Sequence, residues 1–133
     1  MTHWNEWPDD AVSEGVNLLL NADTTFNTQN AGAITALNGT ISGAGNGNVI
    51  ITGAGTFLVN TAQNYSTETI INQGTFEAGS TNVFSANSAV ILSAGGTLNL
   101  GIANQTIASL AGTGGQVVLG TSLVSPATLT WLE

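Results

Sequence analysis

The chain has 133 residues and contains no lysine or arginine, so eight acidic side chains and one histidine give a formal net charge of −8 at pH 7. This balance excludes a nucleic-acid binder that neutralises phosphates, and it excludes a polybasic membrane patch. The absence of cysteine removes disulfides, zinc–thiolate sites and thiol nucleophiles, while 42% apolar residues suffice for the core of one domain.

The first predicted element is an acidic segment over residues 1–15, which carries Trp4 and Trp7. Its Pro8-Asp9-Asp10 run suits the first turn of a helix, where proline and acids are favoured. We therefore expect a short helical turn over residues 5–14, or a tail, in which a tryptophan covers the first layer of the domain. The spacing of its acids does not match a calcium-binding loop.

Period-two alternation dominates residues 16–131, which we expect to form a β-helical repeat domain. A recurring unit begins with glycine and places apolar or small residues at the second and fourth positions after it. Glycine suits such positions because turns and close backbone contacts cost it little. The glycines that open the unit, and that we expect in turns, are Gly39, Gly47, Gly55, Gly74, Gly96 and Gly115.

The spacing of these glycines predicts the architecture. The first three lie 8 residues apart, whereas the later intervals are 19, 22 and 19 residues. A period near twenty is typical of a solenoid whose coil holds three short strands, and eight residues would be one strand and its turn. The sequence therefore predicts an all-β, right-handed parallel β-helix of about five or six coils with a short N-terminal capping segment. The register of the strands stays open at this point.

The unit also predicts which side chains point inward and stack on neighbouring coils. The inward columns are Phe57, Phe76, Leu98 and Val117, beside Val59, Ala78, Leu100 and Leu119. The outward column is Thr56, Thr75, Thr97 and Gln116. Further strands are expected at residues 67–71, 89–92, 105–110 and 128–131.

The run from Gly53 to Gly79 resembles the autotransporter-associated β-strand repeat, also called the passenger-associated transport repeat. That family reads approximately Gly-x-Gly-Thr-Leu, a short apolar strand, Asn-x-Tyr-x-Gly-x-Thr-x-Ile, and Gly-Thr-Leu-x-x-Gly. The matching residues are Tyr65, Thr69, Ile71 and the pair Gly74-Thr75. Glu68 departs from the pattern, because the family often has a small residue there. The resemblance covers about residues 45–120.

The resemblance implies a non-enzymatic piece of a secreted Gram-negative autotransporter passenger, exposed at the cell surface. Its role would be that of a stalk that supports secretion, folding and adhesion. The alternative is a direct adhesin or self-association module that binds host glycans, matrix proteins or its own copies. The translocator β-barrel of such a parent protein would lie outside this sequence, and Leu132-Glu133 is interpreted as the remnant of an expression tag.

The candidate ligand-binding or capping residues are the aromatics Trp4, Trp7, Tyr65 and Trp131. Glu68 and Glu77 are expected on different faces of a coil, which argues against a carboxylate pair for glycoside hydrolysis. His3 stands alone near the start of the chain, so a Ser-His-Asp triad is not expected. We therefore predict no catalytic, metal or cofactor site. We also expect copies of the chain to stack end to end through the Trp131 end, where strand edges are exposed.

Overall fold

A computed structural model describes residues 12–13, 17–43, 46–101, 103–120 and 127–131, and every regular element in these ranges is a β-strand. In chain order the strands are β1 (Val12–Ser13), β2 (Leu18–Leu19), β3 (Thr24–Asn27), β4 (Ile34–Leu37), β5 (Ile41–Ser42), β6 (Val49–Thr52), β7 (Thr56–Val59), β8 (Thr69–Ala78), β9 (Ala89–Asn99), β10 (Gln105–Ile107), β11 (Ser109–Gly112), β12 (Gln116–Val118) and β13 (Leu129–Trp131). The described ranges hold no helix of the length and apolar character that crossing a membrane requires.

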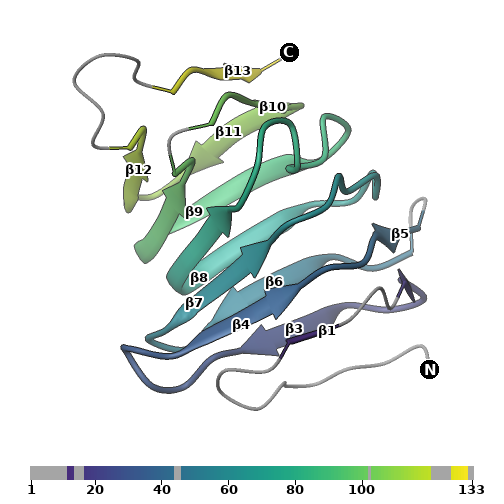
Figure 1. Cartoon of the computed structure of the whole chain (residues 1–133), viewed down its shortest axis with the longest axis horizontal. Coiled ribbons are helices and arrows are strands. Elements are labelled where there is room, and N and C mark those ends of the chain that lie inside the picture. The colour runs from purple at the N-terminus through teal and green to yellow at the C-terminus, as the bar shows by residue number, and fades with distance from the viewer. Residues whose placement is uncertain (1–11, 14–16, 44–45, 102, 121–126, 132–133) are drawn as a thin grey trace.

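The strands wind into a parallel β-solenoid of about 5 turns, which confirms the predicted fold class. The chain climbs from one end of the stack to the other, so that β1 and β3 lie at one end and β12 and β13 at the opposite end (Figure 1). All pairs recorded between the described strands are parallel.

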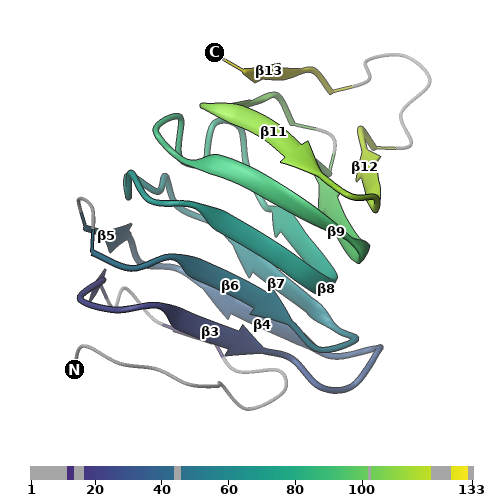
Figure 2. The ribbon, with the colours of Figure 1, turned by 180° about the vertical axis from the view of Figure 1, so that it is seen from behind.

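Three faces make up each coil. Face 1 contains β3, β6, the first halves of β8 and β9, and β11 (Figure 2). Face 2 contains β1, β4, β7, the second halves of β8 and β9, and β12. Face 3 contains the pairs β2–β5 and β10–β13, linked by backbone hydrogen bonds through the intervening coils, such as Gln63 N–H to Val83 O at 2.9 Å.

The register on face 2 confirms the period derived from the glycines. Thr56 pairs with Thr75, Thr75 with Thr97, and Thr97 with Gln116. These partners are separated by 19, 22 and 19 residues, the same intervals that separate the glycines in the sequence. The predicted outward column is therefore one aligned row that runs up face 2.

The eight-residue spacing of the early glycines is confirmed as one strand and its turn. Gly39 precedes β5 on face 3, Gly47 precedes β6 on face 1, and Gly55 precedes β7 on face 2. Three consecutive copies of the unit thus build three consecutive sides of the solenoid. Later in the chain only one copy falls in each coil, because other sequences form the remaining two sides.

Two of the turns expected from the sequence are absent, because β8 and β9 continue around the corner between face 1 and face 2. The strand expected at 67–71 joins the following unit through Gly74, which has a φ of 76°. The register of the β8–β9 pair shifts between Ile71 and Gln73, just before this bend. Conversely, the single strand expected at 105–110 is divided into β10 and β11 on two faces.

Most of the repeat glycines lie where backbone from the previous coil leaves no room for a side chain. A methyl group at Gly74 would overlap the carbonyl oxygen of Gly53, and one at Gly96 would crowd the carbonyl oxygen of Ile71. Gly47 and Gly115 also have positive φ angles, of 114° and 91°. Glycine is therefore required at these corners for close coil stacking as well as for backbone conformation.

The core runs along the solenoid axis and contains a stack of phenylalanine rings. Ring centroids lie 4.4 Å apart for Phe26 and Phe57, 5.9 Å for Phe57 and Phe76, and 4.7 Å for Phe76 and Phe84. The interplanar angles of 13° to 24° give near-parallel rings. One column of aromatic rings thus crosses several coils. Each ring contributes most to the stability of the fold where other rings enclose it on both sides.

At the N-terminal side, Val12 and Ser13 form β1 and pair with Ala36 and Leu37 of β4. Parallel pairing therefore already begins before residue 16, and these two residues are not in the helical turn that the sequence predicts. A strand is favoured here because β4 offers a free edge. Trp4, Trp7, His3 and the rest of the acidic segment lie outside the described residues.

Candidate functional site

Tyr65 is a core residue and offers no face to a ligand. Only 1% of its surface is exposed, and its hydroxyl lies 2.6 Å from Thr69 Oγ1. Burial raises the pKa of its phenol to about 12, although hydrogen bonds from Thr69 and Ser88 act in the opposite direction. The sugar-stacking role considered from the sequence is therefore not available to it, because the ring fills the interior of the third coil.

A buried chain of hydroxyl groups extends from Tyr65 to the next coil. Thr69 Oγ1 lies 2.8 Å from Ser88 Oγ, and Ser88 also donates to the carbonyl oxygen of Thr67 at 2.5 Å. Ser85 Oγ donates to the carbonyl oxygen of Tyr65 at 2.6 Å. These bonds satisfy polar groups that would be costly to bury alone, and they connect two coils.

Two buried glutamines on face 3 also connect successive coils by hydrogen bonds. Gln63 Oε1 accepts the Ile41 N–H at 2.6 Å, one coil earlier. Gln105 Oε1 accepts the N–H groups of Val83 and Phe84 at 2.9 and 3.1 Å. Sequence reasoning missed this ladder. Its signal is a glutamine two positions before a buried residue, as in Gln63-Asn64-Tyr65 and Gln105-Thr106-Ile107.

Two of the three acidic side chains in the described coils, those of Glu68 and Glu77, lie on different faces of the solenoid. Glu68 is exposed at the entry to β8 on face 1, where its N–H donates to Asn48 Oδ1 at 3.0 Å. Glu77 lies on face 2, between Leu58 and Asn99 in the register, and is half-buried. Burial raises the pKa of the Glu77 carboxyl group. Within the described ranges, no group of three or more histidine, cysteine or acidic residues could hold a metal ion.

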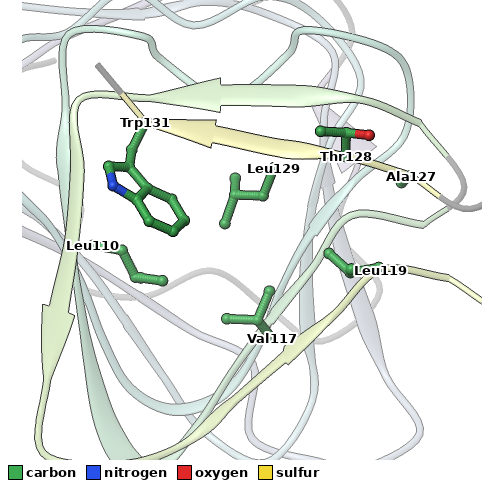
Figure 3. Close-up of a pocket in the computed structure, with 7 residues that line it drawn as sticks. All are labelled: Leu110, Val117, Leu119, Ala127, Thr128, Leu129 and Trp131. Carbon is green, nitrogen blue, oxygen red and sulfur yellow. The ribbon is translucent and has the colours of Figure 1, made fainter. Parts of the chain in front are cut away.

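A hollow lies at the C-terminal end of the solenoid. A cavity of about 410 Å³ lies there between β11, β12 and β13, and its lining side chains converge on it from all three faces (Figure 3). The lining residues are Leu110, Val117, Leu119, Ala127, Thr128, Leu129 and Trp131. We call this surface the C-terminal end.

Three inward positions are exposed at the C-terminal end. Val117 and Leu119 are 36% and 42% exposed, and Trp131 is 54% exposed. The sequence predicts that Val117 and Leu119 belong to the inward columns, and both line the hollow. No described strand covers them, in keeping with the exposed strand edges expected at the Trp131 end.

The chemistry of the C-terminal end is that of an apolar contact surface. Thr128 supplies the one hydroxyl group among the lining side chains, and none of those side chains carries a titratable group. Such a surface can bind apolar or aromatic groups but cannot transfer a proton. Of the two candidate aromatics that the structure describes, Tyr65 is buried and Trp131 lies at an accessible hollow.

Comparison of this chain with protein-family models, with curated proteins and with solved structures found no match in any of the three.

Proposed function

We propose that this chain is a non-enzymatic stalk segment of a secreted autotransporter passenger, displayed at the surface of a Gram-negative bacterium. The observation that carries the proposal is the alignment of the repeat on face 2, where Gly74-Thr75-Phe76 stacks directly on Gly96-Thr97-Leu98. The residues that match the family repeat serve to stack coils, as a stalk requires. The family implies secretion and surface exposure, and these parts of the proposal depend on the resemblance alone.

The arrangement of its side chains supports a mechanical role. Tyr65, Thr69 and Ile71 of the repeat are buried in the core or bonded within it. In the described coils, threonine, serine, asparagine and glutamine side chains provide the polar contacts between coils, and the sequence has no lysine or arginine for an ion pair. A stalk of this kind becomes longer with every coil, because each coil adds one strand spacing of about 4.8 Å to its length.

The alternative, a direct adhesin that binds host glycans or matrix proteins, has one described aromatic in its favour. Trp131 is exposed beside the cavity at the C-terminal end, and tryptophan is a common anchor of binding surfaces. Among the described residues that line this cavity, Trp131 is the one aromatic.

Surface display tests the proposal. The chain is fused upstream of an autotransporter translocator domain in a Gram-negative host, and display is measured by antibody labelling of intact cells. We expect display of the parent chain and of Gly32→Val, because a Cβ added at Gly32 meets no atom within 4 Å. Gly74→Val, which would overlap the carbonyl oxygen of Gly53, should lower display severely.

Two outcomes contradict the proposal. The parent chain would fail to reach the surface although the translocator alone inserts normally. Alternatively, Gly74→Val would be displayed as well as Gly32→Val, which would show that the folded coil stack does not matter for export.

A further inference from the structure

Two asparagines of the chain, Asn38 and Asn46, stand directly before a glycine. In such a dipeptide the glycine nitrogen can attack the asparagine side chain, because one short stretch of backbone holds both groups close together. Glycine favours this attack, since it has no side chain to obstruct the approach and its backbone adopts many conformations. The two dipeptides share this intrinsic chemistry, so the fold decides which of them reacts.

The fold holds the Asn38 side chain between two coils. Asn38 is half-buried, and its Oδ1 accepts a hydrogen bond at 2.8 Å from Asn60 Nδ2, one coil later. The carbonyl oxygen of Gly39 accepts two further bonds, from Thr61 Oγ1 at 2.5 Å and from Gln63 Nε2 at 3.0 Å. Rotation of the Asn38 side chain toward the Gly39 nitrogen would break the bond with Asn60, and the energy of that bond is added to the barrier.

The Asn46 side chain has no such restraint among the described residues. It is exposed at the turn between β5 and β6, and it forms no hydrogen bond with another described residue. Gly47 follows with a φ of 114°, and its N–H donates to no acceptor in the described ranges. Attack by the Gly47 nitrogen on this side chain therefore breaks no bond to the described part of the chain.

We propose that Asn46 is a site of spontaneous deamidation in the folded chain, and that the bond from Asn60 protects Asn38. The Gly47 nitrogen forms a bond to the side-chain carbonyl carbon of Asn46, its proton passes to the side-chain nitrogen, and ammonia leaves. Water then opens the resulting five-membered imide at either of its two carbonyl carbons. One opening gives aspartate, and the other gives isoaspartate, in which the main chain runs through the former side chain.

Either product changes the corner where this coil stacks on the previous one. The backbone of Gly47 lies so close to Ala22 that an added Cβ would overlap its carbonyl group, and the next N–H, that of Asn48, donates to Asp23 Oδ1 at 2.8 Å. An isoaspartyl link lengthens the main chain by one carbon directly before this contact and shifts it. Both products also add a carboxylate to a chain of eight acids without lysine or arginine. We therefore expect deamidation to lower the Tm.

Peptide mapping by mass spectrometry measures both sites in one sample. The folded chain is incubated at mildly alkaline pH and digested with pepsin in acid, where deamidation is slow, and fragmentation locates the modified residue. We expect Asn46 to deamidate about 10-fold faster than Asn38, or more, in the folded chain. In the urea-denatured chain the two sites should convert at similar rates, because the protection of Asn38 depends on the fold.

Two variants test the physical cause. Asn60→Ala removes the donor that holds Asn38, so we expect deamidation at Asn38 to accelerate severalfold while Asn46 keeps its parent rate as an internal control. Asn46→Gln blocks the fast reaction, so its Tm should stay constant during an incubation in which the Tm of the parent chain falls. Circular dichroism checks that both variants fold.

Three results would overturn the proposal. These are an Asn46 that stays intact in the folded chain although it converts in urea, equal rates at Asn38 and Asn46 in the folded chain, and an Asn38 rate that a folded Asn60→Ala leaves unchanged. Where Asn60→Ala does not fold, the folded and denatured parent chains decide alone. The proposal goes beyond the stalk function and requires only the folded chain, so none of these results bears on surface display.

Discussion

Amide and hydroxyl side chains hold successive coils together at the scale of single residues. Asn48 Oδ1 accepts the Glu68 N–H at 3.0 Å, and Asn104 Oδ1 accepts the Thr128 N–H at 2.8 Å. Each bond joins residues 20 or 24 positions apart, which is about one coil. A chain without basic residues can thus fix its register through neutral hydrogen bonds, each contributing about 1 kcal/mol.

The buried phenol of Tyr65 makes the stability of the fold depend on pH above about pH 9. The folded state holds the phenol proton to about pH 12, against 10.0 for an unperturbed phenol. The stabilising effect is complete below pH 10 and is lost as the pH rises toward 12, since the unfolded chain releases its proton first. We expect the free energy of unfolding to fall by about 1 kcal/mol from pH 9 to pH 11 in urea titrations.

Tyr65→Phe is the control for this prediction. The chain has one tyrosine and no lysine, arginine or cysteine, so no other side chain titrates in this window. The variant should lose about 1 kcal/mol at neutral pH but show no decline between pH 9 and pH 11. An equal decline in the variant would refute the assignment to Tyr65.

At the scale of elements, the bends of β8 and β9 make the corner between face 1 and face 2. Gly74 and Gly96 are direct partners in this corner, and Gly115 follows one coil later. A continuous strand around a corner keeps the backbone paired on both sides of the bend. Its cost is a requirement for glycine at Gly74 and Gly96, where backbone of the previous coil leaves no room for a side chain.

Gly74→Ala should therefore destabilise the solenoid. Its φ of 76° strains an alanine by about 1–2 kcal/mol, and the methyl group would overlap the carbonyl oxygen of Gly53. We expect the free energy of unfolding to fall by at least about 2 kcal/mol in chemical denaturation. Gly32→Ala, which meets no neighbouring atom, should change it little. Equal effects of the two substitutions would contradict the corner geometry.

The sequence predicts the stacked units well because glycine, threonine and apolar residues recur at fixed intervals. It predicts an outward column of Thr56, Thr75 and Thr97, and the structure pairs these residues in register. It fails where the structure depends on contacts between coils that do not repeat. Gln105 bonds to two backbone N–H groups about one coil earlier, and such a partner is not visible from local alternation.

The candidate site was predictable only in part. The exposed strand edges near Trp131 follow from any stack that ends, so an accessible apolar end is expected from the sequence. The burial of Tyr65 was not foreseen, because an aromatic residue in a polar run such as Asn64-Tyr65-Ser66 reads as exposed. Its partner Ser88 belongs to the next coil, where sequence proximity gives no indication of contact.

At the scale of the whole molecule, acids without basic partners make the fold less stable as they ionise. Burial raises the pKa of the Glu77 carboxyl group in the folded state. The protonated carboxyl group therefore stabilises the fold at low pH, and this stabilisation is lost as the pH rises through the raised pKa. Release of mutual repulsion among eight acids acts in the same direction. We expect the Tm to rise when the pH is lowered from about 7 to about 5.

Glu77→Gln separates the two contributions to this pH dependence. It should raise the Tm at neutral pH and weaken the pH dependence more than Glu68→Gln does, because Glu68 is exposed. Calorimetry at the two pH values gives the comparison. A Tm that falls on acidification, or two variants with the same slope, would contradict the role of burial at Glu77.

Parallel coils of this chain stack in register at intervals of about twenty residues. Nuclear Overhauser contacts between backbone protons, measured by solution NMR of the labelled chain, report this stacking. We expect contacts in the parallel pattern between Thr56 and Thr75 and between Thr75 and Thr97. Antiparallel contacts between strands adjacent in the sequence, with none across these two pairs, would contradict it.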